Sequence, residues 1–411
     1  MFISYIGRAH GQAALLISAL FASSSSFAQT AVSETEAIER ALSQPEFKTL
    51  GEANHEEAEA RVGGIRRFDN PEATLTREKV SGDGRSETEW QAGITQPLDF
   101  SGRRSALRAA ARAEVAAVSA DTSRRVQERV ADVRRVFAGC AAATEKLRIS
   151  TAFATKLQDA ERIVAARTRA GDIAGYDLRR LRVEARTAEA QVKLTAGDVQ
   201  AECGALARLS GVPNATPATS IAAIALRPAP GAAGTRPDVL AREQRVLAAS
   251  QQVRAAQRAR IPEIGVGLGY KRVTSAESSA GGPVVALGAR IPLFDGGGAA
   301  IREARARQRA REAELSLQRR EIYAAVAGAE ARSTSAIEAA RAAQAAGTDA
   351  SRLGPIAEAA YQGGETGVVE LVDAYRTARD AELEIVDLLE RAARARIDLE
   401  LAQGSINNAG L

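Results

Sequence analysis

The residues of this sequence that could do chemistry are two cysteines and a few acids. Cys140 and Cys203 are the only cysteines, and they lie at equal sequence distances from the stretch RAGDIAGYD, which contains Gly171 and Gly175. If this stretch turns one helix back onto another, the two cysteines lie at the same height and can form a disulfide in an exported protein. The alternative is two small buried residues. We expect the disulfide.

Two acids follow a second glycine-rich stretch, YQGGETG. Glu370 and Asp373 stand at the start of the helix that we expect after this stretch. One interpretation is structural, because the helix dipole favours carboxylates in a first turn. The other applies if several copies of the chain meet on one axis, because carboxylates that converge in a narrow mouth attract cations. Both interpretations stay open at this point.

The sequence lacks the residue sets of known enzymes. His55 is the only histidine beyond the first ten residues, and Met1 is the only methionine. We find no Ser/His/Asp set, no cluster with the spacing of metal ligands and no phosphate-cradling loop. Gly265, Gly267 and Gly269 resemble such a loop superficially, but no helix follows them. We therefore expect no enzyme activity, no metal site and no cofactor.

The N-terminus has the features of a secretory signal over residues 1–28. Its apolar run, AALLISALFA, is about ten residues long, whereas a membrane helix needs roughly 20. No cysteine follows the cleavage site to carry a lipid anchor. The formal charge is +4 over 411 residues, but arginine and glutamate alternate at helical spacing. This pattern favours solvated helix faces and argues against a nucleic-acid partner.

Four landmarks occur twice along the chain, in the same order and 191 to 195 residues apart. The pairs are Pro71 and Pro262, Pro97 and Pro292, Gly171 and Gly364, and Gly211 and Gly404. Solenoid repeats are about 20–50 residues long, so each copy here is a whole structural half. We assign the first unit to 29–211 and the second to 237–404. The Pro/Ala/Gly-rich segment 212–236 is the expected linker, and 405–411 is a tail.

Each unit is predicted to contain two strands and then two long helices. Alternation with one apolar face predicts strands at about 70–80 and 86–97, and at about 263–273 and 283–293. Pro97 and Pro292 lack a backbone N–H and should help to end the second strand of each pair. The Ala-rich stretches that follow predict helical hairpins. They cover 103–210, with the tip near 171, and 299–403, with the tip near 364.

The strands indicate that several chains must close one barrel. Strands of about ten residues with one apolar face, edged by Trp90 and Tyr270, have the length and pattern of outer-membrane strands. Four strands cannot close, and open edges in hydrocarbon leave unpaired backbone groups. Three chains would give twelve strands, which begin to leave a lumen, and twelve helices. A sheet in water and a periplasmic coiled coil without a pore are the alternatives.

The combination of motifs resembles the TolC outer-membrane factor family. The likeness lies in IPLFDGG after the strands, GETGVVELVDAYRTARDAE at the second break, and LARLSGVP and LELAQG at the ends of the units. DNPEATLTRE and GRRSALRAAARAE look most like the CzcC-type branch, which serves heavy-metal efflux pumps of the resistance-nodulation-division class. The resemblance implies an α+β membrane protein: a trimeric, 12-stranded outer-membrane barrel continuous with a long periplasmic α-helical barrel.

The resemblance also implies positions for a gate and for partners. Acids after the second break narrow the periplasmic entrance of TolC, which places the gate here at Tyr361, Glu370, Asp373 and Asp177. The arginine that helps to close TolC falls at Thr366, so that contact is missing. A periplasmic adaptor protein would dock at the helix tips. The tip residues are Gly171, Asp172, Gly175, Gly364, Glu365 and Gly367.

The implied function is the exit duct of a tripartite efflux pump for heavy-metal cations. An inner-membrane transporter would supply the energy, and outer-membrane lipid would contact the barrel, with Trp90 and Tyr270 at the membrane interface. The same duct could instead serve multidrug efflux or type I protein secretion. No catalytic residue is implied.

Overall fold

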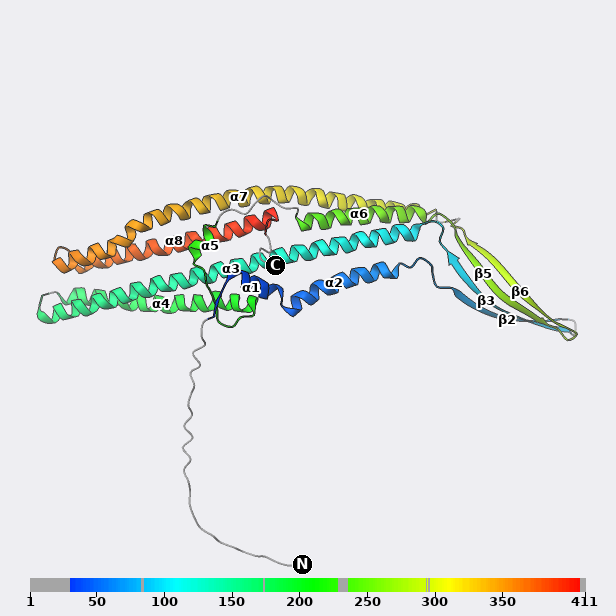
Figure 1. The fold of residues 1–411 in the computed structure, drawn as a ribbon, viewed down its shortest axis with the longest axis horizontal. Helices are drawn as coiled ribbons and strands as arrows, with labels where there is room; N and C mark the ends of the chain where they lie inside the picture. The colour runs from blue at the N-terminus through cyan, green and yellow to red at the C-terminus, as the bar shows by residue number, and fades with distance from the viewer. Residues whose placement is uncertain are drawn as a thin grey trace, which may run out of the picture.

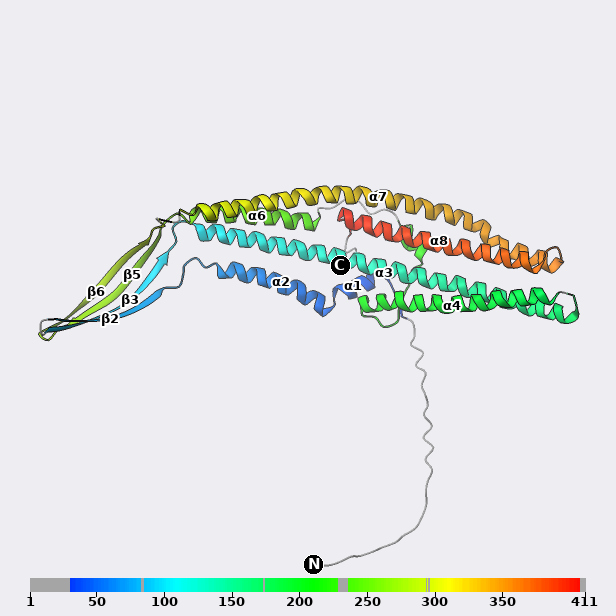
Figure 2. The ribbon, with the colours of Figure 1, turned by 180° about the vertical axis from the view of Figure 1, so that it is seen from behind.

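The protein is a long molecule with a β-sheet at one end and two helix tips at the other (Figure 1; Figure 2 from behind). The computed structural model describes residues 30–82, 85–172, 174–227, 236–292, 294 and 296–406. The expected signal segment 1–28 lies outside the described residues, as does 407–411 of the expected tail. Within the described ranges, no helix is both long and apolar enough to cross a membrane.

Each half of the chain contributes a helix, two strands, a long helix and a returning helix. The first half contains α2 (Pro45–Gly64), β2 (Glu72–Gly82), β3 (Arg85–Leu98), α3 (Arg103–Ala170) and α4 (Gly175–Ser210). The second contains α6 (Pro237–Arg258), β5 (Glu263–Thr274), β6 (Ser279–Arg290), α7 (Gly298–Gly363) and α8 (Val368–Gln403). The expected duplication of strand–strand–long helix–helix units is confirmed. The opening helices α2 and α6 were not predicted.

The observed strands differ from the prediction most at the start of β6 and at Pro97. β6 covers Ser279–Arg290, so it begins four residues before the predicted start at 283. Pro283 is tolerated inside it because β6 is an edge strand. Pro97 lies within β3, opposite Gly265, and does not end that strand. The pairing of β3 with β2 has already ended at Thr95, so Pro97 stands beyond that ladder.

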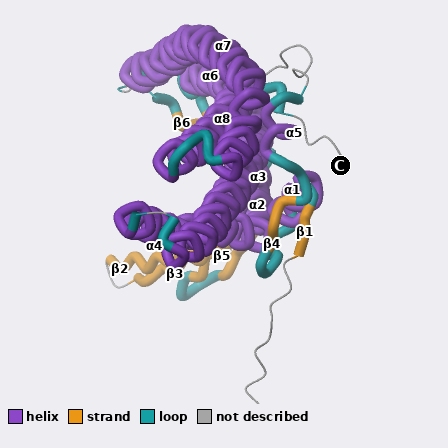
Figure 3. The backbone as a smooth tube through the Cα atoms, turned by 90° about the vertical axis from the view of Figure 1, so that its left-hand side faces the viewer, coloured by secondary structure: helices purple, strands orange, loops and turns teal. Residues whose placement is uncertain are grey.

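The segment 212–236, the expected linker between the units, contains secondary structure of its own. It contains β4 (Ala215–Pro217), which pairs in parallel with β1 (Thr30–Val32), and α5 (Ile221–Ala225), which packs against α8 and α3. Residues 228–235 lie outside the described part. Together with α1 (Glu34–Leu42), these short elements lie on one side of the helices, near the middle of their length (Figures 1 and 3), and we call them the collar.

The long helices stand side by side in one curved layer, which is visible end-on in Figure 3. α3 contacts α2 and α4 on one side and α6 and α8 on the other, and α7 contacts α6 and α8. Each chain therefore supplies four helical columns: α3, α7, and two columns split into α2 with α4 and α6 with α8. Buried alanines of α3 and α6, such as Ala117, Ala120 and Ala241, allow close packing in this layer.

The joints of the two split columns are closed in the same way. Gln44, the N-cap residue of α2, donates its amide Nε2–H to the carbonyl of Leu209 at the end of α4, at 2.8 Å. Arg236, the N-cap residue of α6, donates Nη1–H to the carbonyl of Ala402 at the end of α8, at 2.6 Å. These side chains satisfy carbonyls that a helix end leaves without partners.

The hairpin tips form where glycine allows a left-handed backbone. Gly171 ends α3 with φ of 87°, and Gly364 ends α7 with φ of 79°. At both positions the chain then makes the hydrogen bonds of a Schellman-type cap, from Asp172 to the carbonyl of Arg167 and from Glu365 to the carbonyl of Ala360. Any residue with a Cβ would be strained there, so the two sharp returns depend on these glycines.

A buried ion network ties the collar to the helices. Arg134 of α3 lies between Glu34 of α1, at 3.0 Å, and Glu400 of α8, at 2.6 Å. Glu400 also pairs with Arg396 at 3.0 Å. Removing one member would leave an uncompensated buried charge, which typically costs about 3–5 kcal/mol. The network therefore fixes the N-terminal segment and the end of α8 relative to α3.

The structure joins Cys140 of α3 to Cys203 of α4 by a disulfide, the pairing expected from the sequence. The bridge spans 63 residues of sequence and crosses the first hairpin well away from its tip. Both cysteines belong to the main apolar core, with Val133, Phe137 and Leu206 among its other members.

We predict that the bridge stabilises the first hairpin. The double variant Cys140→Ser/Cys203→Ser should lose roughly 2–4 kcal/mol of unfolding free energy, because the unfolded chain gains entropy when the loop is opened. Denaturant unfolding of the purified protein measures this loss, and the wild-type protein under reducing conditions is the matched comparison. Two free thiols in non-reducing mass spectrometry would contradict the assignment.

Candidate functional site in the sheet and the helix tips

The four long strands form one antiparallel sheet with two free edges. Their order is β2-β3-β5-β6, so β2 and β6 each have a neighbour on only one side within this sheet. The register places Leu75 opposite Ala92, Ala92 opposite Tyr270, and Tyr270 opposite Pro283. This unbroken register fixes which side chains share a face.

One face of the sheet is apolar and uncovered, and we call it the outer face. Val285 and Leu287 on it are 76% and 79% exposed. An apolar surface this large and this exposed needs an apolar environment. Its apolar members are Ala73, Leu75, Trp90, Ala92, Ile94, Leu98, Ile264, Val266, Leu268, Tyr270, Pro283, Val285, Leu287 and Ala289.

The opposite, inner face is polar and rich in glycine. Lys271 of β5 and Glu89 of β3 form an ion pair on it at 2.5 Å. A Cβ on Gly269 would lie only 2.6 Å from the backbone oxygen of Ala92, so the two strands approach too closely there for any other residue. Acids outnumber bases on this face within the described strands. The acids are Glu72, Glu78, Glu87, Glu89 and Glu263, and the bases are Arg85, Lys271 and Arg290.

The aromatic residues of the sheet end lie at two levels. Trp90 and Tyr270, the predicted membrane-interface residues, share the outer face on neighbouring strands. Sequence reasoning missed a second group, Phe68, Phe100 and Phe294, which are 53%, 71% and 102% exposed. Each stands where the chain passes between a helix and a strand. The stretches RRFDNP, LDFSG and PLFDG contain this signal in the sequence.

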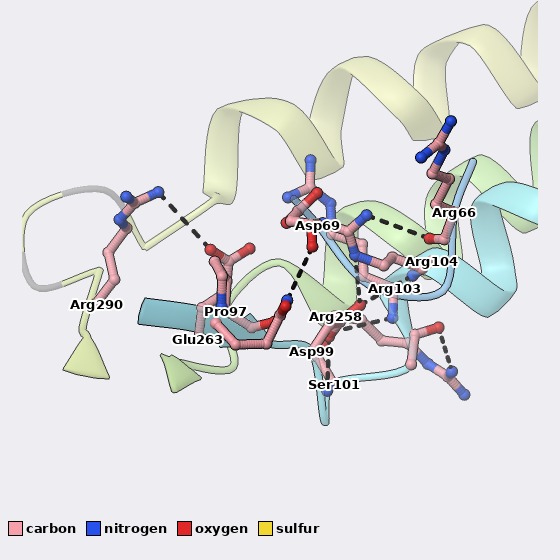
Figure 4. A network of polar contacts seen from close by, with 12 residues as sticks. Arg66, Asp69, Pro97, Asp99, Ser101, Arg103, Arg104, Arg258, Glu263 and Arg290 are labelled. Atoms are coloured by element: carbon pink, nitrogen blue, oxygen red, sulfur yellow. Dashed lines mark hydrogen bonds and ion pairs between the residues drawn. The ribbon is translucent and has the colours of Figure 1, made fainter. Parts of the chain in front are cut away.

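The junction between β3 and α3 is held by residues of the first PLDFSG turn. The Asp99 carboxylate accepts the backbone N–H groups of Ser101, at 2.9 Å, and Arg104, at 3.2 Å (Figure 4). Gly102 has φ of 70°, and its carbonyl accepts Nη1–H of Arg258 at 2.9 Å. Arg104 also pairs with Asp69. These contacts fasten the sheet to the helices.

At the other end, Tyr361 is a buried contact between the two hairpins. Its side chain is 5% exposed and packs in an apolar cluster with Leu157, Val164 and Leu371. The guanidinium carbon of Arg167 lies 5.0 Å from its ring centroid. Its hydroxyl has no hydrogen-bond partner among the described residues, and the same holds for Oγ1 of Thr366.

The three predicted gate acids have different surroundings. Glu370 accepts the N–H of Gly367 at 3.1 Å, which is the helix-start role that the sequence left open. Asp373 is exposed and Asp177 is half-buried, and within the described part of the chain neither carboxylate has a hydrogen bond or ion pair. No such contact joins Tyr361 and these three acids within one chain. Convergence would therefore require other copies of the chain.

Contacts between the hairpins near the tips escaped the sequence analysis. Arg376 of α8 pairs with Glu184 of α4, and the guanidinium carbon of Arg379 lies 4.4 Å from the ring centroid of Phe153. Within the second hairpin, Tyr375 of α8 donates its hydroxyl O–H to Glu358 of α7 at 2.7 Å. Burial of Tyr375, together with this bond to a carboxylate, raises the pKa of its hydroxyl, so the donor stays protonated.

The predicted docking residues occupy the end of the molecule farthest from the sheet (Figure 1). Gly171, Asp172, Gly175, Gly364, Glu365 and Gly367 are all exposed. A Cβ on Gly171, Gly175 or Gly364 would meet no atom within 4 Å. The tips are therefore free surface in a single chain. No group of three or more His, Cys, Asp or Glu among the described residues could hold a metal ion.

Comparison with known sequences identifies one family. The sequence model described as Outer membrane efflux protein matches residues 23–212 and 230–405, so the gap between the two matches falls in the segment that connects the units. No curated protein gives a significant match to the sequence.

Solved structures share the fold. A membrane protein from Pseudomonas aeruginosa has a TM-score of 0.73 and 21% identity, over 91% of this chain and 93% of that chain. CusC has a TM-score of 0.73 and 20% identity, over 92% and 95%. VceC from Vibrio cholerae has a TM-score of 0.72 and 21% identity, over 90% and 96%. At these identities the likeness shows the arrangement of strands and helices.

We predict that substitutions of Asp373 and Glu370 have different effects, because only Glu370 also holds the start of α8. Asp373→Asn removes a charge without breaking a contact and should lower cation-over-anion selectivity in planar bilayers, by roughly twofold to tenfold if the acids converge. Glu370→Gln weakens the cap of α8 and should also lower stability, by about 0.5–2 kcal/mol. If both variants keep the wild-type selectivity, the acids only begin a helix and the gate prediction is wrong.

Proposed function

The chain belongs to the outer membrane efflux protein family, and on this basis we propose that three copies form the exit duct of a tripartite pump for heavy-metal cations. Membership places the protein in the outer membrane with its helices in the periplasm, and it confirms that the protein is not an enzyme. It also removes the alternative of a coiled coil without a pore. The trimer, the cargo, the gate and the docking partners are our proposal.

The observation that carries the proposal is an apolar sheet face with two unpartnered edges. In hydrocarbon, each unpaired backbone group at an edge costs several kcal/mol, so β2 and β6 need strands from other chains. Two chains would give an eight-stranded barrel whose interior side chains fill, whereas three give twelve strands and a lumen. A trimer is the smallest closed assembly that can conduct.

The duplication supplies a pattern for closing the ring. Within one chain, β3 pairs with β5, and α3 packs against α6 and α8. The equivalent surfaces between chains are β6 against β2, and α7 against α2 and α4. Apolar side chains are uncovered on both helical surfaces: Tyr323 of α7 is 81% exposed and Val183 of α4 is 65% exposed. Their exposure supports a second chain in contact with each side.

The charges of the inner face support a cationic cargo. Five acids and three bases point inward from the described strands of one chain, so three chains would give the barrel an excess of negative charge. Exposed Asp373 adds three carboxylates near the helix tips. The likeness of DNPEATLTRE and GRRSALRAAARAE to the heavy-metal branch points in the same direction.

The tips support docking of a periplasmic adaptor. The two hairpin turns are exposed and lie at the end of the molecule away from the sheet (Figure 1). In a trimer six such turns would form one ring at the entrance of the duct. An adaptor that grips this ring would connect the duct to an inner-membrane transporter, which supplies the energy that a passive channel lacks.

We predict conductance and metal sensitivity as two separate results. The purified protein should form cation-selective channels in planar bilayers. A strain that lacks the gene should become sensitive to at least one of zinc, cobalt, cadmium and copper, and the wild-type gene should restore tolerance. A protein that never conducts would contradict the duct. Unchanged metal tolerance together with increased sensitivity to drugs, or with loss of a secreted protein, would contradict the metal cargo. The proposal that the protein is a duct would then stand.

A further inference from the structure

Three bases form a small group on the outer face of the sheet, beyond its apolar rows. Arg77 of β2 lies opposite Trp90 of β3, and Trp90 lies opposite Arg272 of β5. Lys79 is the next outward residue along β2. We call Arg77, Lys79 and Arg272 the outer cationic cluster.

The charges of the strands are sorted between the two faces. In the described strands, the outer face carries these three bases and no acid, whereas all five strand acids lie on the inner face. An unpaired charge next to lipid is costly unless a counter-charge meets it. The sorting therefore indicates that the counter-charge of the cluster comes from outside the chain.

The contacts of the cluster leave it available to a ligand. Among the described residues, no carboxylate lies within ion-pair distance of Arg77, Lys79 or Arg272. The guanidinium carbon of Arg77 lies 5.1 Å from the ring centroid of Trp90. Arg272 donates Nε–H to the Ser279 hydroxyl at 3.3 Å. Both contacts orient a guanidinium and leave most of its N–H donors free.

The position of the cluster along the strands indicates which leaflet of the membrane it faces. β2 runs from the helix side of the sheet at Glu72 to the far tip at Gly82 (Figure 1), so Arg77 and Lys79 lie on the tip side of Leu75. Because the helices are periplasmic, the tip side faces the outer leaflet. Bases just beyond the hydrocarbon meet lipid headgroups, and the outer leaflet of this membrane is built of lipid A, a phosphorylated glycolipid.

We propose that the outer cationic cluster binds the phosphate groups of lipid A. The inference rests on the proposed barrel, in which three clusters stand around the circumference. Each guanidinium can donate paired N–H groups to one phosphate, while the acyl chains of the same lipid lie along the apolar outer face below. The cluster would thereby fix the height of the barrel in the outer leaflet.

The test counts lipid A molecules bound to the purified assembly by native mass spectrometry. Lipid A should bind more tightly than its dephosphorylated form and than phosphatidylglycerol or phosphatidylcholine. Arg77→Gln/Arg272→Gln should weaken lipid A binding by about tenfold or more, the scale of one lost charged hydrogen bond. Arg77→Lys/Arg272→Lys keeps the charge and should retain most of the binding.

The control removes the same charge from the inner face. Lys271→Gln/Arg290→Gln should leave lipid A binding at the wild-type level, because both residues point away from lipid. Equal losses in the two double variants, or no loss in the outer one, would overturn the inference. So would equal affinity for lipid A and its dephosphorylated form. If the wild-type protein forms a conducting ring without these preferences, only this inference fails, whereas a protein that forms no ring contradicts the proposed function as well.

Discussion

Unpaired backbone at two strand edges is the constraint on which the rest of this structure depends. β2 and β6 bound a sheet whose outer face is apolar and exposed, and hydrocarbon offers no partner for their free N–H and C=O groups. A single chain therefore cannot be the functional molecule in the membrane. On the inner face, Gly269 lets β3 and β5 approach more closely than any residue with a Cβ would allow.

Because the chain is duplicated, the contacts between its two halves provide the pattern for contacts between chains. This pattern requires that each chain hold its two halves at a fixed angle. Several contacts of different kinds maintain that angle. Arg134 bridges Glu34 and Glu400 at the collar, Gln44 and Arg236 close the joints of the split columns, and Arg376 pairs with Glu184 near the tips. At the sheet end, the contacts of Asp99 and Gly102 fix the strands relative to the helices.

The sequence was informative where one residue type decides the local backbone. Gly171 and Gly364 could be placed at the tips because only glycine accepts their positive φ without strain, and alternation placed most of the strands. It was uninformative where distant segments decide. β4 exists through its pairing with Thr30–Val32, far away in the chain, and the partner of Arg376 lies on another hairpin. The opening helices α2 and α6 were not predicted, and the sequence left open whether Glu370 begins a helix or narrows a mouth, whereas the structure shows its contact with the N–H of Gly367.

The number of chains in the native assembly tests the central claim most directly. Native mass spectrometry of the mature protein, released from outer membranes in mild detergent, should show a particle of three chains. Denaturation should then return one chain mass. This ring should dominate over a wide range of protein concentration, because its strand edges are paired only when it is closed. A protein that is extracted as a monomer, or only as a dimer, would contradict it.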